Sequence, residues 1–159
     1  MADHPSHRLA RDVADRLRTR TPREQYVRAV VRYNHGDDRR TIDGLRRLLR
    51  RDDVPRKLAS DAQYLLGRSY SRSGQRSRSR RTFERLHEQH GRPSALYRLA
   101  GLEVTGDADL DAVQTYRRFA RLYPNHGLAD DALWQAAKAA ERHDEFALAG
   151  EVYKQLYRT

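Results

Sequence analysis

Residues 112–134 read AVQTYRRFARLYPNHGLADDALW and hold two helical patterns on either side of a junction at Pro124. Before the junction, small or aromatic side chains recur three or four residues apart: Ala112, Tyr116, Phe119 and Tyr123. This spacing places them on one face of an α-helix. After the junction, Asp130 and Asp131 are acidic groups of the kind favoured at the positive end of a helix. The segment therefore predicts two amphipathic helices separated by a turn.

The same pattern recurs along the chain at a nearly constant period. Large residues fill the position of Tyr116 in every unit, at Leu45, Phe83, Tyr116 and Tyr153, with spacings of 38, 33 and 37 residues. A second aromatic position recurs at Tyr26, Tyr64, Tyr97 and Trp134. Self-similarity at such a period marks stacked helical units. We therefore expect an all-α chain of about four helix–turn–helix pairs, at approximately residues 22–57, 58–93, 94–127 and 128–159.

Turn and cap residues fit this division. The residues suited to a turn or cap between paired helices are Gly36, Gly74, Asp107 and Asp144. At the first helix, Thr21, Pro22 and Glu24 form a capping-box pattern, in which the side chains satisfy free backbone donors. Residues 1–20 are expected to form an N-terminal tail and a short capping helix.

The repeated unit resembles the tetratricopeptide repeat. The residues that match its register most directly are Gly67, Tyr70, Ser79, Phe83 and Leu86, and Ala112, Tyr116 and Pro124 repeat it. Arg32, Gln63 and Glu103 depart from it, because the family often has large apolar or aromatic residues there. The resemblance implies a right-handed superhelical array over residues 21–159, with the first helix of each pair lining the concave surface.

Within that family, the junction from Tyr123 to Trp134 is similar to those of bacterial cell-envelope repeat proteins. It is most similar to the superhelical N-terminal domain of soluble lytic transglycosylases. This resemblance implies a cell-envelope or periplasmic location, and a peptide or a peptidoglycan glycan strand as partner. The start of the chain, Met1–Arg8, lacks the apolar core of a secretory signal. We therefore expect a piece of a longer envelope protein or, if the chain is complete, a cytoplasmic one.

The sequence holds no catalytic constellation. Lytic transglycosylases carry their acid in a Glu-Ser motif, and no Glu of this chain is followed by Ser. Cysteine, a Gly-rich phosphate loop and a nucleophile elbow are also missing. Glu84 and His87 have the spacing of a carboxylate-bridged metal site, but a single copy beside Arg81 and Arg85 favours a surface histidine. We expect no catalysis, cofactor, bound metal or membrane span in this chain.

The positive charge lies in the N-terminal part of the chain. Residues 1–99 hold 25 Lys and Arg against 12 acids, a net of +13, whereas residues 100–159 hold 7 against 10, a net of −3. Clusters such as Arg46, Arg47, Arg50 and Arg51 could bind nucleic acid or another polyanion. Arg outnumbers Lys by 29 to 3, however, which indicates a coding bias and solvated helix faces rather than nucleic-acid binding.

The family resemblance predicts a partner-binding concave face. The residues it places there are Tyr26, Tyr64, Arg68, Arg72, Tyr97, Trp134, Lys138 and Arg142. Tyr, Trp and Arg dominate binding hot spots, so this face could hold an extended peptide or a glycan strand. The alternative is that the rings pack between neighbouring helix pairs. We therefore expect a non-catalytic scaffold of the lytic-transglycosylase type or, alternatively, a free-standing adaptor for protein–protein interaction.

The last helix is expected to leave an apolar face open, because repeat arrays normally close with a polar-faced cap. Its large apolar and aromatic residues are Phe146, Val152, Tyr153, Leu156 and Tyr157. A following repeat, a partner, or a second copy of the chain through self-association could cover that face.

Overall fold

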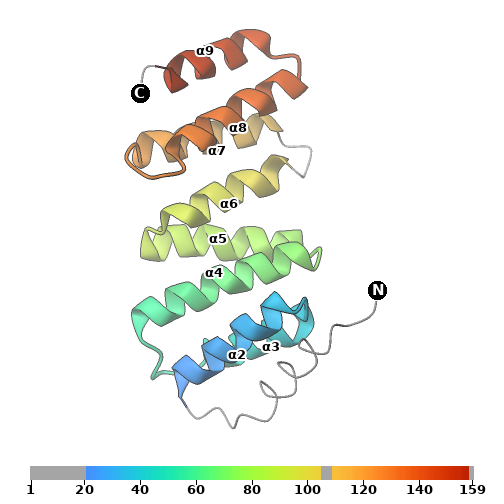
Figure 1. Cartoon of the computed structure of the whole chain (residues 1–159), viewed down its shortest axis with the longest axis vertical. Helices are drawn as coiled ribbons and strands as arrows, with labels where there is room; N and C mark the ends of the chain where they lie inside the picture. The colour runs from blue at the N-terminus through green and yellow to red at the C-terminus, as the bar shows by residue number, and fades with distance from the viewer. Residues whose placement is uncertain (1–20, 105–108, 158–159) are drawn as a thin grey trace. The chain divides into compact units, whose positions relative to one another are not determined.

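The computed structural model describes residues 21–104 and 109–157 of the 159-residue chain. These residues form eight α-helices and no β-strand (Figure 1): α2 (Pro22–Asn34), α3 (Asp38–Leu48), α4 (Arg56–Arg72), α5 (Arg76–His90), α6 (Pro93–Val104), α7 (Asp109–Leu122), α8 (Ala129–Arg142) and α9 (Phe146–Leu156). The all-α prediction is confirmed. The predicted cap in residues 1–20 and the turn residue Asp107 lie outside the described residues.

The chain divides into two compact units, residues 1–82 and 83–159. The first unit contains α2, α3, α4 and the beginning of α5. The second contains the rest of α5 and α6 to α9.

The first described helix begins with the predicted capping box. The Glu24 backbone N–H donates to Thr21 Oγ1 at 3.2 Å, and the Thr21 backbone N–H donates to Glu24 Oε2 at 3.0 Å. Pro22 occupies the first turn, where its missing N–H costs nothing. The local sequence therefore fixes where α2 starts.

Left-handed residues separate the helices of three pairs. Gly36 and Gly74 have φ of 77° and 75°, and Asp144 has φ of 58°. Glycine adopts this conformation without steric cost, and Asp tolerates it better than most other residues. The turn prediction is confirmed at these three positions.

The core of the first unit lies among α2, α3 and α4. The helix α3 packs against both α2 and α4, and α2 also contacts α4. The buried side chains of this core are Ala29, Ile42, Leu45, Leu48, Ala62, Leu65, Leu66 and Tyr70. The stripe that the sequence predicts around Leu45 is therefore a core stripe.

Ser79 occupies a small-residue position of the repeat. It is fully buried, and its hydroxyl donates to the Gly67 carbonyl at 2.8 Å. The hydrogen bond offsets the cost of burying the hydroxyl. Ser79 thus links α5 to α4 directly.

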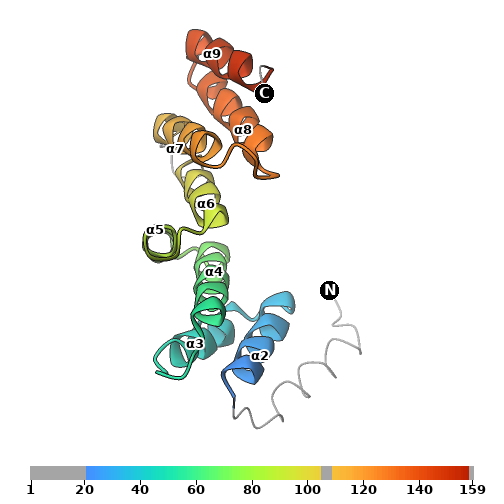
Figure 2. The same cartoon turned by 90° about the vertical axis from the view of Figure 1, so that its left-hand side faces the viewer.

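The core of the second unit runs through α6 to α9, and α8 packs against both α7 and α9 (Figure 2). One side of α8 is rich in fully buried small residues: Ala132, Ala136, Ala137, Ala139 and Ala140. Small side chains let neighbouring helices approach closely. Phe119 and Val113 of α7 are buried in the same cluster as these alanines.

The helix α9 buries most of its apolar side. Val152 is fully buried, and Tyr153 and Leu156 pack against the core of the second unit. Phe146 and Tyr157 are exposed, at 66% and 81%. The expectation of an open apolar face is therefore wrong for Val152, because this residue is buried in the same cluster as the alanines of α8. Self-association through the C-terminal helix stays a prediction.

None of the helices in the described part of the chain is long and apolar enough to cross a membrane.

Candidate binding surfaces

The helix α8 presents three of the predicted site residues along one face. Trp134, Lys138 and Arg142 are spaced by four residues, so they lie one above the next on the helix surface. Trp134 is 45% exposed. Its ring meets the ring of Tyr153 on α9 edge-on, with the centroids 5.7 Å apart. The tryptophan is therefore held in place and still available to a partner.

Polar contacts fix the side chains beside this tryptophan. Lys138 Nζ forms an ion pair with Glu141, and the Tyr153 hydroxyl donates to Glu141 Oε1 at 3.1 Å. The hydrogen bond from Lys138 lowers the pKa of Glu141 below its ordinary value. Desolvation, and then the bond to Glu141, raise the pKa of Tyr153. We call this set the Trp134 surface, and its members are Trp134, Lys138, Glu141, Arg142 and Tyr153.

Tyr97 occupies the same repeat position on α6 but a different environment. Its ring packs edge-on against Tyr116 and Phe119 of α7, with centroid distances of 5.3 and 5.6 Å. Its hydroxyl donates to Asp131 in the first turn of α8. Desolvation and this hydrogen bond raise the pKa of Tyr97 well above its ordinary value. The contacts agree with the packing interpretation for this ring.

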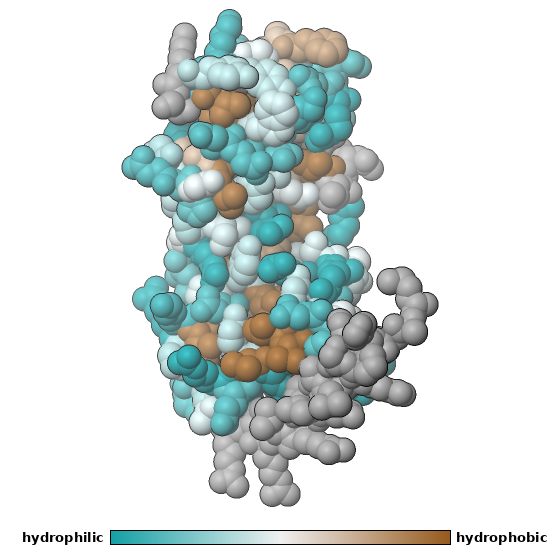
Figure 3. All heavy atoms as spheres, in the orientation of Figure 1, coloured by the Kyte–Doolittle hydropathy of each residue, from teal (hydrophilic) through white to brown (hydrophobic). Residues whose placement is uncertain are grey.

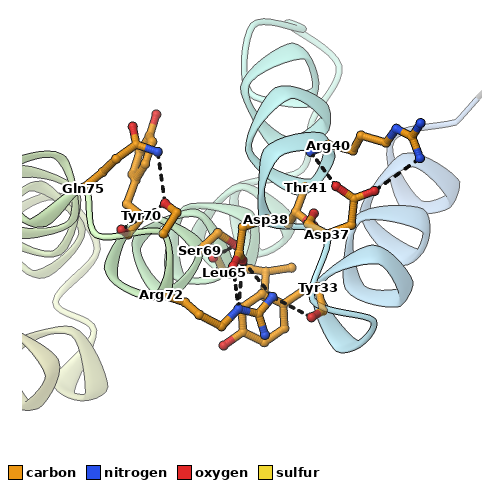
Figure 4. A network of polar contacts seen from close by, with 11 residues as sticks. Tyr33, Asp37, Asp38, Arg40, Thr41, Leu65, Ser69, Tyr70, Arg72 and Gln75 are labelled. Atoms are coloured by element: carbon orange, nitrogen blue, oxygen red, sulfur yellow. Dashed lines mark hydrogen bonds and ion pairs between the residues drawn. The ribbon is translucent and has the colours of Figure 1, made fainter. Parts of the chain in front are cut away.

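In the first unit, Arg72 is engaged by the chain itself (Figure 4). Its Nε lies 2.7 Å from Asp38 Oδ2, and its Nη2 donates to the Tyr33 carbonyl at 2.6 Å. The Arg72 guanidinium also lies over the Tyr33 ring, 3.8 Å from its centroid, and that of Arg68 lies at 4.9 Å. These contacts join α4 to α2 and α3. The hydrogen bond with Asp38 raises the pKa of Arg72.

The remaining predicted residues are half-buried. Tyr26 packs against the core of the first unit, and Tyr64 lies on α4. The structure therefore places Tyr26, Tyr64, Arg68 and Arg72 in the first unit and Tyr97, Trp134, Lys138 and Arg142 in the second. A shared role in partner binding stays a prediction.

Sequence reasoning missed the partners of these residues. Asp38 and Tyr33 hold Arg72 from 34 and 39 residues away. The sequence predicts Tyr153 only as one of the large residues of the last helix. Its contact with Trp134 needs the fold, because no local spacing pairs the two helices.

Two cavities also lie on the surface. One, of 470 Å³, is lined by Gln114, Arg117, Arg118, Ala120, Arg121, Pro124, Ala129, Asp130, Leu133 and Gln155. The other, of 440 Å³, is lined by Gln25, Arg28, Ala29, Arg32, Gly44, Arg47, Arg50 and Arg51. Hydrophilic residues dominate the face shown in Figure 3, and hydrophobic residues form separate patches on it.

In the part of the chain that the structure describes, no group of three or more His, Asp or Glu side chains could hold a metal ion. His87 meets the Tyr123 ring edge-on, with the centroids 6.2 Å apart. This placement supports a packing role for a histidine that the sequence marks as a weak metal candidate.

Comparison with known families identifies the repeat. Residues 61–91 and 94–126 each match the family profile described as tetratricopeptide repeat. These two segments are tetratricopeptide-like repeats. The two matched segments cover α5 and α7 and most of α4 and α6. No curated protein sequence matches the chain.

Solved structures agree with this fold. A structure of MamA superposes with a TM-score of 0.74 at 14% identity, over 96% of this chain and 85% of that one. MamA from Desulfovibrio magneticus RS-1 gives 0.68 at 17% identity, over 99% and 96%. The TPR-like repeats attributed to a Podosopora anserina kinesin light chain give 0.67 at 16%, over 99% and 96%. At such identities the likeness shows the fold alone. These matches give no support to the lytic transglycosylase resemblance.

Proposed function

We propose that this chain is a non-catalytic adaptor that binds another protein, with the Trp134 surface as its principal contact. The observation that carries the proposal is the exposed, fixed tryptophan on the first helix of the last pair. Tetratricopeptide-like repeats and their structural matches fit a scaffold for protein interaction better than any reaction.

The chemistry of the Trp134 surface suits a peptide partner. Trp, Tyr and Arg are the residue types that contribute most at protein interfaces. Lys138 and Glu141 add one charge of each sign beside the ring. Because Tyr153 already orders both Trp134 and Glu141, binding loses less side-chain entropy than it would at a mobile site.

The alternative function in the cell wall has less support than the adaptor function. A scaffold for a lytic transglycosylase, with a peptidoglycan strand as ligand, depends on the junction sequence from Tyr123 to Trp134. The family profile and the solved structures favour the adaptor, so we do not extend the proposal to the glycan or to an envelope location.

Peptide selection tests this function. Peptides are selected from a displayed random library on the whole chain, and their affinities are measured by calorimetry. We expect Trp134→Ala to weaken the selected peptides at least about tenfold, the loss of one hot-spot contact. Leu122→Ala is the matched control, since Leu122 is a 47% exposed apolar residue of α7 and not a member of the Trp134 surface. Peptides that bind both variants like the unmodified chain would overturn the proposal, as would a selection that yields no binder.

A further inference from the structure

The first unit holds a cavity whose lining is strongly basic. Eight described residues line it, and five of these are arginines: Arg28, Arg32, Arg47, Arg50 and Arg51. None of the described lining residues is acidic. The cavity in the second unit differs, because Asp130 stands among its arginines. We call the basic cavity the α2–α3 groove, after the two helices that supply all but the last residues of its lining.

The geometry of α2 and α3 aligns these arginines. Arg28 and Arg32 are four residues apart, so they share one face of α2. Across from them, Gly44 on α3 has no side chain, and a Cβ added there would lie 3.8 Å from Arg32 Nη1. The small residue thus leaves room for a guanidinium between the helices. Arg47 is exposed in the last turn of α3, and Arg50 is exposed in the segment that follows this helix.

The groove lies on a different face of α2 from the predicted concave residues. Arg28 and Arg32 each stand two positions from Val30, which is about 200° around a helix. Val30 continues the face of Tyr26. A ligand in the groove would therefore use another side of α2 than one bound through Tyr26.

The chain itself shows how a carboxylate meets this groove. At its rim, Arg51 Nε donates to Asp53 Oδ1 at 2.8 Å and Arg51 Nη2 donates to Asp53 Oδ2 at 2.7 Å. Two parallel bonds of this kind are the geometry in which a guanidinium recognises a carboxylate. Arg47 and Arg50, which are exposed, carry the same fork of donors.

The size and lining of the groove favour a peptide over a nucleic acid. Along α2 it runs from Gln25 to Arg32, about 10 Å at the helical rise, which an extended peptide covers in about three residues. None of the described residues that line it is aromatic, so these residues offer no platform for stacking bases. A short run of carboxylates fits both its length and its charge.

We propose that the α2–α3 groove binds a short acidic segment of a protein partner, rich in Asp or Glu. This site goes beyond the Trp134 surface and does not depend on it. A partner that used both surfaces would make charged contacts with the α2–α3 groove and aromatic contacts with the Trp134 surface.

A fluorescein-labelled hexaglutamate peptide tests the groove directly, by anisotropy with the whole chain at about 50 mM salt. We expect binding that Arg47→Gln with Arg50→Gln weakens about tenfold or more. The matched control is Arg81→Gln with Arg85→Gln, which removes the same charge from exposed positions of α5. The control is expected to change affinity less than about twofold, as distant exposed charges are screened.

A second variant separates shape from charge. Gly44→Leu adds a side chain beside Arg32 without changing the net charge, and it should weaken the peptide as well. Circular dichroism confirms that each variant is folded. Trp134→Ala should leave hexaglutamate binding intact, so that failure here is distinguishable from failure of the Trp134 surface.

Three results would overturn the proposal. Equal weakening by the α5 control would show attraction to net charge alone. The absence of hexaglutamate binding would show that the groove has no such ligand. Tighter binding of single-stranded oligothymidylate, lost in the same Arg47 and Arg50 variant, would assign the groove to nucleic acid instead.

Discussion

Tyr97 and Trp134 occupy the same position of successive repeats and make different contacts. Tyr97 meets two rings of α7 and a carboxylate of α8, whereas Trp134 meets one ring of α9 and is 45% exposed. Tyr97 is half-buried because α7 supplies two rings and α8 a carboxylate around it, whereas α9 supplies one ring to Trp134. The same sequence position can therefore stabilise the fold in one repeat and face a partner in the next.

The Tyr97 hydroxyl should be measurable as a stabilising group. Tyr97→Phe removes the hydrogen bond to Asp131 and keeps the ring contacts, so we expect the free energy of unfolding to fall by about 1–2 kcal/mol. Tyr157→Phe is the control, because Tyr157 is 81% exposed and its change should cost less than about 0.5 kcal/mol. Urea denaturation measures both. Equal stability of the two variants would contradict the role assigned to Tyr97.

Glu141 should show the electrostatics of the Trp134 surface. Lys138 lowers the pKa of Glu141, so the ionised carboxylate is favoured in the folded chain. Its stabilising contribution is then present above the ordinary pKa of glutamate and is lost as the pH falls through the lowered pKa. Carbon NMR of the Glu141 carboxyl should give a midpoint below the ordinary pKa of a glutamate side chain. Lys138→Gln should raise the Glu141 midpoint, and no change in it would contradict the ion pair.

At the scale of the helix pair, one residue in the turn decides how easily the two helices connect. Gly74 has φ of 75°, and a Cβ added there meets nothing within 4 Å. The cost of Gly74→Ala is therefore conformational, and we expect a loss of about 1 kcal/mol. Gly127→Ala is the matched control, since it also meets no neighbour and has no such φ, and it should be neutral or slightly stabilising. Thermal unfolding measures both, and a Gly74→Ala variant as stable as the control would contradict the turn.

The sequence predicts those features of the helices and turns that depend on local signals. The capping box at Thr21 and Glu24 and the left-handed turns at Gly36, Gly74 and Asp144 depend on neighbours in sequence, so the sequence predicts them. The contacts of Arg72 with Asp38 and Tyr33 depend on how α4 meets α2 and α3. The sequence predicts Arg72 as a partner-binding residue of the concave face, and this role stays a prediction. Arg72 is exposed in the structure while it contacts Asp38 and Tyr33, and a sequence pattern gives the face of a helix but not such contacts.

At the scale of the whole molecule, two separate groups of buried side chains form the cores of the two units. Leu45→Ala removes a fully buried side chain of the first unit, which should cost about 2–5 kcal/mol. Hydrogen exchange should show the loss of protection concentrated in α2, α3 and α4, with a smaller change in α7 to α9. Equal loss in both sets of helices would show that the two cores act as one cooperative unit.

Trp134 is the only tryptophan of the chain, and its fluorescence therefore reports the proposed contact alone. The most direct measurement titrates a selected binding peptide that lacks tryptophan into the whole chain while the emission spectrum is recorded. We predict a blue shift that saturates with the same dissociation constant as calorimetry gives, because the partner removes the half-exposed ring from water. Saturating binding with an unchanged Trp134 spectrum would contradict the assignment of this surface to the partner.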